Sequence, residues 1–335
     1  MLNLTGQEMV PIASKLGKTV EELRNSRILV NGATGFIGSW IVNFLEFLNF
    51  EFDYKIEIIA PTRNLKNISK NAHRVVGTSY LHLDYRFVNS YNFGSIDFVF
   101  NGATSSHKKS GSTDEIGSYA ATINSTKNII INSVRTKSKP RVINLSSGAV
   151  YEPQNSPQLE RDVPYFNSNE INYRQSKIES EKIIHDATNS GIIQGSNLRL
   201  FAFFGPGLPL NEHFAIGNFV RDALYNTKVH VLGNPNTTRS YMYSEDLIVW
   251  LFKGLLTPFD KNYNIGSEYS LSIQDLANII SEMFGNLPVV YESKQSQASC
   301  YVPSTVNFRK DYGVTESISL SEGLRKWIDF IVSNS

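Results

Sequence analysis

The fold of this chain is decided by the stretch Arg27-Ile28-Leu29-Val30-Asn31-Gly32-Ala33-Thr34-Gly35-Phe36-Ile37-Gly38. Its apolar run, Ile28 to Val30, predicts a short buried strand. Three spaced glycines follow, and from Trp40 to Leu48 the apolar residues recur at helical spacing. The stretch therefore predicts a strand, a glycine turn and a helix in direct succession.

Strands and helices continue to alternate towards the C-terminus. Short apolar runs predict strands over 56–60, 80–83, 97–100, 141–145 and 196–203. Longer patterns predict helices over about 116–136 and 172–189. This alternation is typical of parallel strands joined by crossover helices, so the predicted fold class is α/β, with a Rossmann-type doubly wound parallel sheet.

The regular alternation ends at Gly205-Pro206-Gly207. Beyond it the patterns are shorter, and they predict helices near 215–225 and 272–284 and strands at 229–232 and 289–290. We expect these elements to form a smaller α+β lobe at the carboxyl ends of the sheet strands, where ligands bind in such folds. The predicted division is a helical N-terminal extension over 1–26, a dinucleotide-binding domain over 27–205 plus about 238–268, and a substrate lobe over 206–237 and 269–335.

The composition narrows the class of protein. With 32 basic and 31 acidic residues the net charge is +1, so nothing indicates a nucleic-acid-binding surface. The single cysteine, Cys300, excludes an intrachain disulfide and fits a reducing compartment. No apolar stretch has the length of a membrane span, and the N-terminus lacks the apolar centre of a signal peptide. These features together predict a cytoplasmic protein. The six histidines show no metal-ligand spacing, so we expect no metal site.

The glycine turn carries the first functional hypothesis. Gly32 permits the sharp turn, Gly35 lets the backbone approach a pyrophosphate, and Gly38 lets the helix pack on the strand. The N–H groups at the start of the helix then face the phosphates. The predicted cofactor is NADP or NAD, and its expected contacts in the turn are Gly32, Thr34, Gly35, Phe36, Ile37 and Gly38.

The choice between the two cofactors depends on the residue after the second strand. An acid there favours the free ribose 2′-hydroxyl of NAD, whereas an arginine accommodates the 2′-phosphate of NADP. The chain has Thr62-Arg63-Asn64 and no acid at this point. Arg63 therefore favours NADP(H), and NAD stays open as the alternative.

A candidate catalytic set consists of Ser147, Tyr173 and Lys177. Ser147 follows the strand over 141–145, and the other two lie four residues apart, one turn from each other on the same face of a helix. A free phenol titrates near pH 10, roughly, and is a poor base at neutrality. A lysine cation and an oxidised nicotinamide nearby favour the phenolate, and the serine hydroxyl steadies the substrate oxygen during hydride transfer.

In this order, the glycine turn, the serine and Tyr173-x-x-x-Lys177 resemble the extended short-chain dehydrogenase/reductase superfamily, which includes the nucleotide-sugar epimerases, dehydratases and reductases. The resemblance covers nearly the whole chain from Arg27. It implies that Tyr173 and Lys177 also contact the cofactor, and that Asp84 lies beside the adenine.

The segment over 101–107 resembles the family's H-x-A-A-x-S-H segment along the nicotinamide and the sugar. Asn101 stands where the family usually has a histidine. The resemblance implies that Ala103 contacts the cofactor and that Ser106 and His107, together with Ser147, contact the substrate.

The second half of the chain carries further matches. Gly205-Pro206 is similar to the family's G-P turn, and the segment over 239–246 resembles the one whose arginine grips the nucleotide diphosphate. A guanidinium suits a phosphate group, so the resemblance implies that Arg239 binds the diphosphate. Asn211 and His213, which follow the G-P turn, are expected to contact the diphosphate or the sugar.

The residues after Ser147 narrow the reaction. In the family, dehydratases carry an Asp-Glu pair at this point and decarboxylases a glutamate, whereas Gly148-Ala149 cannot exchange a proton. Neither elimination nor decarboxylation is therefore expected. Because Arg63 favours NADPH, the preferred hypothesis is a 4-keto-6-deoxy-sugar reductase. The resemblance implies a role in making surface-polysaccharide sugars.

Two alternatives stay open. A NAD-dependent nucleotide-sugar 4-epimerase needs the same three catalytic residues, so the set cannot separate it from the reductase. A non-catalytic NAD(P)-sensing protein is the alternative of another class, and the presence of both Tyr173 and Lys177 argues against it. The family resemblance also implies a homodimer, with a nucleotide-diphosphate sugar as the substrate. The charge balance and the lack of a membrane-length apolar stretch indicate no nucleic-acid or membrane partner.

Overall fold

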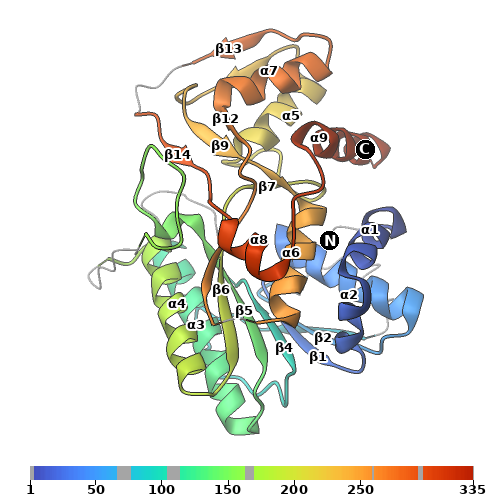
Figure 1. Ribbon diagram of the computed structural model, residues 1–335, viewed down its shortest axis with the longest axis vertical. Coiled ribbons are helices and arrows are strands. Elements are labelled where there is room, and N and C mark those ends of the chain that lie inside the picture. Colours follow the sequence, from blue (N-terminus) through green and yellow to red (C-terminus); the bar gives the residue numbers. More distant parts are fainter. Residues whose placement is uncertain are drawn as a thin grey trace. The chain divides into compact units, whose positions relative to one another are not determined.

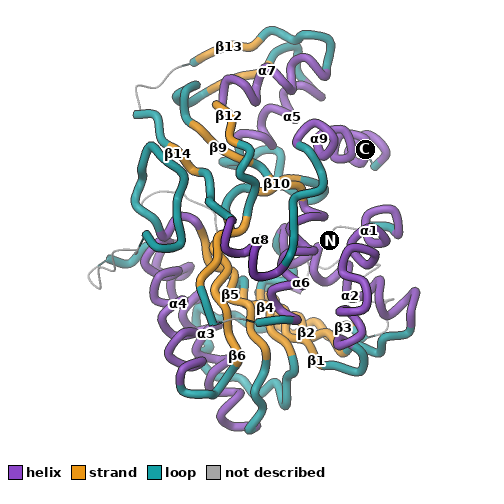
Figure 2. Tube along the Cα trace, viewed as in Figure 1, coloured by secondary structure: helices purple, strands orange, loops and turns teal. Residues whose placement is uncertain are grey.

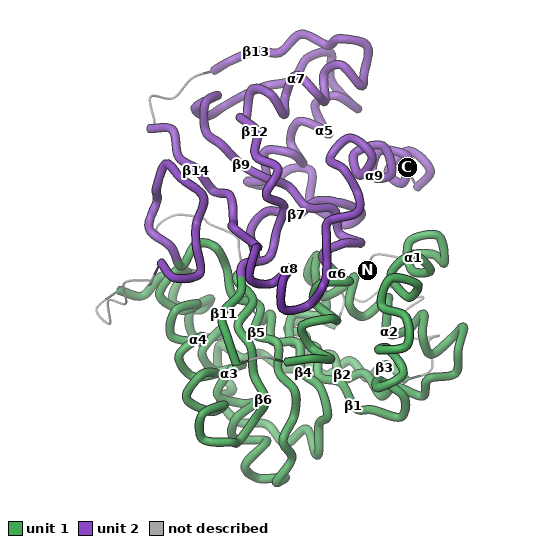
Figure 3. The backbone as a smooth tube through the Cα atoms, viewed as in Figure 1, with its two compact units in different colours: residues 1–150, 164–200, 248–263 green, residues 151–163, 201–247, 264–335 purple. Residues whose placement is uncertain are grey.

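The computed structural model describes residues 4–65, 77–103, 114–162, 170–258, 260–292 and 297–334. The chain forms two compact units (Figure 3). Unit 1 comprises residues 1–150, 164–200 and 248–263, and unit 2 comprises residues 151–163, 201–247 and 264–335. None of the described helices combines the length and the apolar character that a membrane crossing requires.

Unit 1 is built on a seven-stranded sheet with the strand order β11-β6-β5-β4-β1-β2-β3. The strands from β1 to β6 pair in parallel. The order reverses between β1 and β4, which makes this the switch point at which doubly wound sheets bind ligands. The predicted fold class is thus confirmed, and the strands are β1 Arg27–Asn31, β2 Glu57–Thr62, β3 Thr78–His82, β4 Phe98–Asn101, β5 Arg141–Ser147, β6 Gln194–Leu200 and β11 Asn262–Ile265.

Helices cover both faces of this sheet (Figures 1 and 2). On one face Leu29 and Val142 belong to an apolar cluster with Ile129 of one helix and Ile184 of the next. On the other face the Phe252 ring lies 5.0 Å from Phe100 and 4.9 Å from Phe44, measured between ring centroids. The first face is covered by α3 Asp114–Thr136 and α4 Tyr173–Asn189, the second by α2 Phe36–Phe52 and α6 Ser244–Leu256.

The N-terminal extension forms α1 Gly6–Leu16 and a 3-10 helix, η1 Gly17–Leu23. Thr5 and Glu8 form a capping box at the start of α1. The helix is amphipathic, because it buries Met9, Ile12 and Leu16 along one face.

Unit 2 contains short strands and four helices within its described residues. Strand β9 pairs with β12 in antiparallel and with β14 in parallel orientation, and β13 pairs with β8. The strands are β7 Phe203–Phe204, β8 Val229–Val231, β9 Thr238–Ser240, β10 Met242–Tyr243, β12 Ser270–Ser272, β13 Val289–Tyr291 and β14 Cys300–Tyr301. The helices are α5 Ala215–Tyr225, α7 Ile273–Met283, α8 Val306–Tyr312 and α9 Leu320–Ser333.

One predicted strand, over 196–203, is divided in the structure. β6 ends at Leu200, and Phe203–Phe204 form β7, which pairs with β10 in unit 2. At the break the backbone of residue 202 accepts a hydrogen bond from Met242 N. The apolar run continues through the break, so hydrophobicity alone could not reveal where the chain leaves the sheet.

A row of asparagine side chains crosses the sheet on the face that α3 and α4 cover. Asn31, Asn101, Asn144 and Asn197 are successive cross-strand partners in β1, β4, β5 and β6, and each is at most 3% exposed. Each side-chain nitrogen donates to the oxygen of the next asparagine, at 3.1, 3.0 and 2.8 Å. Asn197 continues the row to Asn262 of β11 at 2.9 Å.

This asparagine row also binds the two covering helices. Asn101 donates to Thr126 Oγ1 of α3 at 2.9 Å, and Asn144 donates to Ser180 Oγ of α4 at 3.2 Å. A slip of one strand by one residue would turn its asparagine to the opposite face and leave buried amides unpaired. The row therefore specifies the register of the strands and the position of both helices on them.

We expect Asn144→Leu to lower the free energy of unfolding by about 2–4 kcal/mol, because it leaves buried amide groups on both neighbouring strands unsatisfied. Urea unfolding followed by circular dichroism measures the loss. Asn262→Leu, at the exposed end of the row, is the matched control and should cost less than about 1 kcal/mol. Equal losses for the two variants would show that the row does not specify the register.

Candidate active site

The glycine turn lies at the switch point of the sheet. Gly32 has a φ of +85°, and a Cβ atom there would lie 2.6 Å from the carbonyl oxygen of Gly102, just after β4. A Cβ atom at Gly38 would lie 2.1 Å from the carbonyl oxygen of Gly32. Both positions therefore require glycine, the first for the turn and the second for the approach of α2 to it.

The start of α2 has the features that a pyrophosphate requires. Gly35 is the N-cap, no side chain of the described residues caps this end, and no acidic residue lies in the first turn. Thr34 and Gly35 are exposed, and Phe36 and Ile37 are half-buried. The N–H groups and the positive end of the helix dipole are thus available to phosphate oxygens, so these residues fit a dinucleotide.

The carboxyl ends of β2 and β3 bring Arg63 and Asp84 close enough for Arg63 to lower the pKa of Asp84. The larger cause of that lowered pKa is Arg86, whose guanidinium donates to both oxygens of the Asp84 carboxylate at 3.0 Å. Arg63 itself is exposed. No acidic residue follows β2 directly, as the sequence predicted.

The segment after β4 is described only in its first residues. Gly102 and Ala103 are half-buried and follow Asn101 of the asparagine row. The predicted substrate contacts Ser106 and His107 lie outside the described residues.

The structure brings the three candidate catalytic residues together in unit 1. Ser147 is the last residue of β5, and Tyr173 is the first of α4. Burial raises the pKa of the Tyr173 phenol, and a hydrogen bond between the side chains of Ser147 and Tyr173 opposes that shift. In the protein alone the phenol is thus held in its neutral form, and its ionisation requires positive charge beside it.

Lys177 is buried one turn after Tyr173. Its Nζ atom donates to the carbonyl oxygen of Leu145 at 2.7 Å and lies 5.7 Å from the centroid of the Tyr173 ring. Burial lowers the pKa of Lys177 to about 8, against the opposing effect of Glu181. The lysine therefore carries its charge at neutral pH and releases a proton more readily than a surface lysine does.

The turn after β5 contains no acid. Residues Gly148–Val150 form a 3-10 helix, η4, and Ala149 N donates to Ser147 Oγ at 3.1 Å. The two residues that follow Ser147 therefore orient the serine without supplying an acid or a base.

The predicted substrate contacts of the second half lie in unit 2. Arg239 of β9 is half-buried, donates to the carbonyl oxygens of Thr238 (2.9 Å) and Ser299 (3.2 Å), and lies over the Tyr301 ring. Burial lowers the pKa of Arg239 from its ordinary high value. Asn211 and His213 are exposed, and the His213 ring lies 4.2 Å from that of Phe214.

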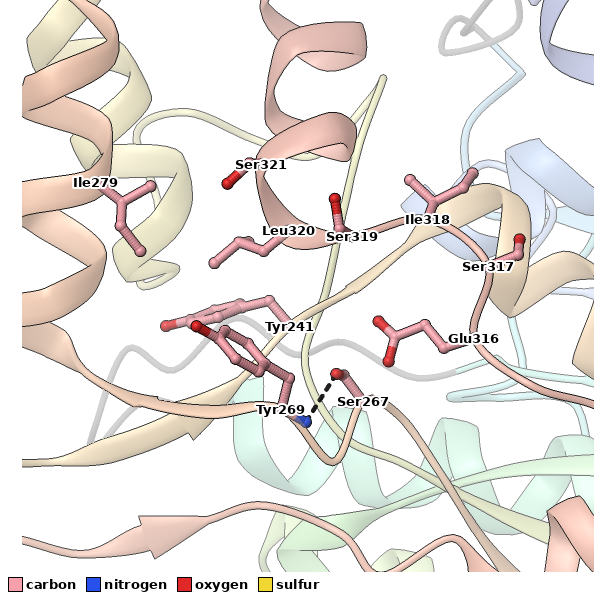
Figure 4. Close-up of a pocket in the computed structure, with 10 residues that line it drawn as sticks. All are labelled: Tyr241, Ser267, Tyr269, Ile279, Glu316, Ser317, Ile318, Ser319, Leu320 and Ser321. Atoms are coloured by element: carbon pink, nitrogen blue, oxygen red, sulfur yellow. Dashed lines mark hydrogen bonds between the residues drawn. The ribbon is translucent and has the colours of Figure 1, made fainter.

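Unit 2 also has a pocket of about 430 Å³ that contains none of these three residues. Its lining includes Tyr241, Tyr269 and Glu316 (Figure 4). Burial raises the pKa of Glu316 to about 7, and a hydrogen bond from Ser267 opposes the shift.

Three buried polar residues on β5, α4 and β6, the elements around Lys177, were not predicted from the sequence. Ser146, Glu181 and Arg199 are buried together in unit 1. Arg199 and Glu181 form an ion pair at 2.8 Å. An available signal was the arginine inside the otherwise apolar end of a strand, because a charge at such a position needs a buried partner.

This chain is similar to known proteins in sequence and in fold. The chain is 22% identical over 325 residues to a UDP-glucuronic acid decarboxylase 1 of Xenopus tropicalis, covering 93% of this chain and 74% of that protein. It is 25% identical over 320 residues to a putative UDP-glucose 4-epimerase of Methanocaldococcus jannaschii, covering 92% and 99%. The structure resembles that of a UDP-glucose 4-epimerase from Thermotoga maritima solved with UDP-glucose, with a TM-score of 0.75, 18% identity, and coverage of 92% and 99%.

The sequence model of one family, the NAD dependent epimerase/dehydratase family, matches residues 28–266, from the first strand of the sheet to just beyond its last. This match confirms the family that the glycine turn and the Ser147–Tyr173–Lys177 set predicted. The chain belongs to the NAD dependent epimerase/dehydratase family of enzymes.

Proposed function

We propose that this enzyme transfers hydride at C4 of a nucleotide-diphosphate sugar and acts as a NAD-dependent 4-epimerase. The observation that carries the C4 hydride transfer is the assembled set of Ser147, Tyr173 and Lys177 followed by the acid-free turn Gly148-Ala149. This set can move one proton at a sugar hydroxyl and can do no further acid–base chemistry at the neighbouring carbons.

In the proposed reaction the Tyr173 phenolate takes the proton of the C4 hydroxyl while the C4 hydrogen leaves as hydride. Ser147 donates a hydrogen bond to the same oxygen, and the charge on Lys177 stabilises the phenolate. Bound NAD would supply the hydride acceptor, the returning hydride and a positive charge beside the phenol. The keto sugar then rotates in the site, so that hydride would return to the opposite face of C4 while Tyr173 returns the proton to the C4 oxygen. The cofactor would therefore be unchanged after one cycle.

The residues proposed to hold the cofactor are those of the glycine turn and its neighbours. The turn and the start of α2 would bind the pyrophosphate, and Arg63 and Asp84 would lie by the adenosine half. The further proposed cofactor contacts are Thr34, Phe36, Ile37, Ala103, Tyr173 and Lys177. In unit 2 Arg239 would bind the sugar nucleotide's diphosphate, with Asn211 and His213 as further contacts.

Two observations favour the epimerase over the reductase that the sequence suggested. The family is NAD dependent, and a relative that matches this chain over 99% of its own length is a putative UDP-glucose 4-epimerase. Names of decarboxylases among the relatives carry less weight, because Gly148-Ala149 lacks their expected glutamate. The 4-keto-sugar reductase stays the second candidate, since Arg63 follows β2 without an acid beside it.

We expect Tyr173→Phe to lower turnover of UDP-glucose to UDP-galactose by at least about 100-fold, the range for loss of a general acid–base group. Dinucleotide affinity should stay nearly unchanged, since the ring remains. Chromatography of the sugar nucleotides measures turnover, and fluorescence titration measures binding. Tyr91→Phe, which removes an exposed phenol, is the matched control. Full activity of the Tyr173 variant would refute the catalytic assignment.

The nucleotide released when the purified protein is denatured separates the two candidates. An epimerase that recycles its cofactor should release NAD in near-equal amount to the protein. An empty site that takes up added NADPH in preference would instead support the reductase. A panel of UDP-, dTDP-, CDP- and GDP-sugars then identifies the substrate.

We expect Arg63→Ala to weaken NADPH binding by about tenfold or more and NADH binding little, because only NADPH carries a 2′-phosphate for the guanidinium. Isothermal titration of the nucleotide-free protein measures both constants. Arg135→Ala, at an exposed position near the end of α3, is the control for a general loss of positive charge. Equal weakening of both cofactors by Arg63→Ala would remove the argument for NADP.

A further inference from the structure

We propose that Glu181, held by Arg199 and Ser146, is a positioning residue: it fixes the position of Lys177 and stabilises the positive charge of that lysine. This inference rests on the proposed function for its catalytic consequence. Its structural part, the coupling of Glu181 to Lys177, can be measured without substrate.

The carboxylate of Glu181 is buried and fully engaged. Arg199 Nε donates to Oε1 at 2.9 Å, and Arg199 Nη2 donates to Oε2 at 2.8 Å, which is the bidentate geometry of a strong guanidinium–carboxylate pair. The Ser146 hydroxyl also donates to Oε1. Glu181 is 6% exposed and Arg199 2% exposed.

Glu181 ties α4 to the strand that carries the catalytic serine. Ser146 and Arg199 are cross-strand partners in β5 and β6, so the carboxylate binds both strands at one level. One turn earlier on α4, Lys177 binds the carbonyl oxygen of Leu145. Two anchors one turn apart on the helix thus meet two consecutive residues of β5, directly before Ser147, and fix how far α4 can slide or rotate.

The backbone of the same helical turn is also held. Ser180 donates to the carbonyl oxygen of Lys177 at 2.9 Å and accepts from Asn144 of the asparagine row. Asn197 of the same row donates to the carbonyl oxygen of Glu181 at 3.2 Å. The turn over 177–181 is therefore bound to β5 and β6 through side chains and backbone alike.

The buried charges favour a catalytic consequence over a purely structural one. A buried ion pair adds little net stability, because desolvation offsets the attraction, and apolar residues of the same size often stabilise more. Here the negative carboxylate lies one turn from Lys177 and opposes the effect of burial on the pKa of that lysine. Without Glu181 the lysine would lose its proton at a lower pH, and the Tyr173 phenolate would lose the positive charge of Lys177 beside it.

Other ionisable groups also lie close to this turn. Tyr119 of α3 donates to Glu179 of α4, and burial, with Glu179 beside it, raises the pKa of Tyr119 to about 12. Tyr173 also has a raised pKa, and Arg199 of β6 stays charged. Within the described part of β5 and η4 beside this turn, residues 142–150 contain no ionisable side chain.

The test substitutes Glu181→Gln, which keeps the shape and removes the charge. The alkaline limb of the pH profile of kcat should move down by about 1 pH unit, with little change in KM, because the Glu181 charge that raises the pKa of Lys177 is lost. Glu179→Gln, the same change two residues earlier on the face towards α3, is the matched control and should leave the limb in place. An unmoved limb in Glu181→Gln would overturn the proposal.

A second measurement needs no substrate. The folded pKa of Lys177 is lowered from 10.5 to about 8, so between these values the unfolded chain binds more protons, and the free energy of unfolding gains a term that rises with pH. In Glu181→Gln this rise should begin about 1 pH unit lower than in the parent protein. Urea unfolding at a series of pH values from neutral to alkaline measures it, and coincident curves would refute the coupling.

Glu181→Gln leaves Arg199 buried without its anion and could prevent folding. The double variant Glu181→Gln/Arg199→Met removes both charges and should fold, since neutral replacements of buried ion pairs are tolerated. In this double variant the alkaline limb of the kcat profile should still lie at a lower pH than in the parent enzyme. A limb at the same pH as in the parent enzyme would show that Glu181 acts only through the fold. If the parent enzyme turns over no sugar nucleotide, the proposed function fails, and the unfolding curves still decide the role of Glu181.

Discussion

The approach of two backbones at the switch point of the sheet is the constraint on which unit 1 depends. The carbonyl oxygen of Gly102 leaves no room for a side chain at Gly32, and the carbonyl of Gly32 leaves none at Gly38. This contact brings the start of α2 against the ends of β1 and β4 with its N–H groups uncapped by any described side chain. A bulkier turn would separate the helix from the sheet and remove the anion-binding end at once.

Hydrogen bonds of buried polar side chains also connect the strands from β1 to β11 and bind α4 to them. The asparagine row links β1 to β11 through in-register side chains, and α4 is bound to β5 through Lys177 and Glu181. Such groups are costly when unpaired and add modest stability when paired, so their main effect is to exclude other registers. In this enzyme the register determines how close Tyr173 of α4 comes to Ser147 of β5.

The proposed reaction is limited by the groups that are missing as well as by those present. In it the phenol and the lysine exchange one proton, while the turn after Ser147 adds no second acid or base among its residues. Burial raises the pKa of Tyr173 and lowers that of Lys177, which acts against the charged form of both. The charged pair therefore depends on surrounding charges, and among the described residues Glu181 raises the pKa of Lys177.

Much of the fold and of the site could be predicted from the sequence. The order of strands and helices, the glycine turn and the Ser147–Tyr173–Lys177 set depend on spacing along the chain, which hydrophobic period and turn chemistry reveal directly. The break after Leu200 was missed because the apolar run crosses it. What only the tertiary structure decided is which buried polar groups meet. Arg199 finds Glu181 across 18 residues and Asn31 finds Asn101 across 70, because strand register and helix placement, which no local pattern encodes, bring them to the same level of the sheet.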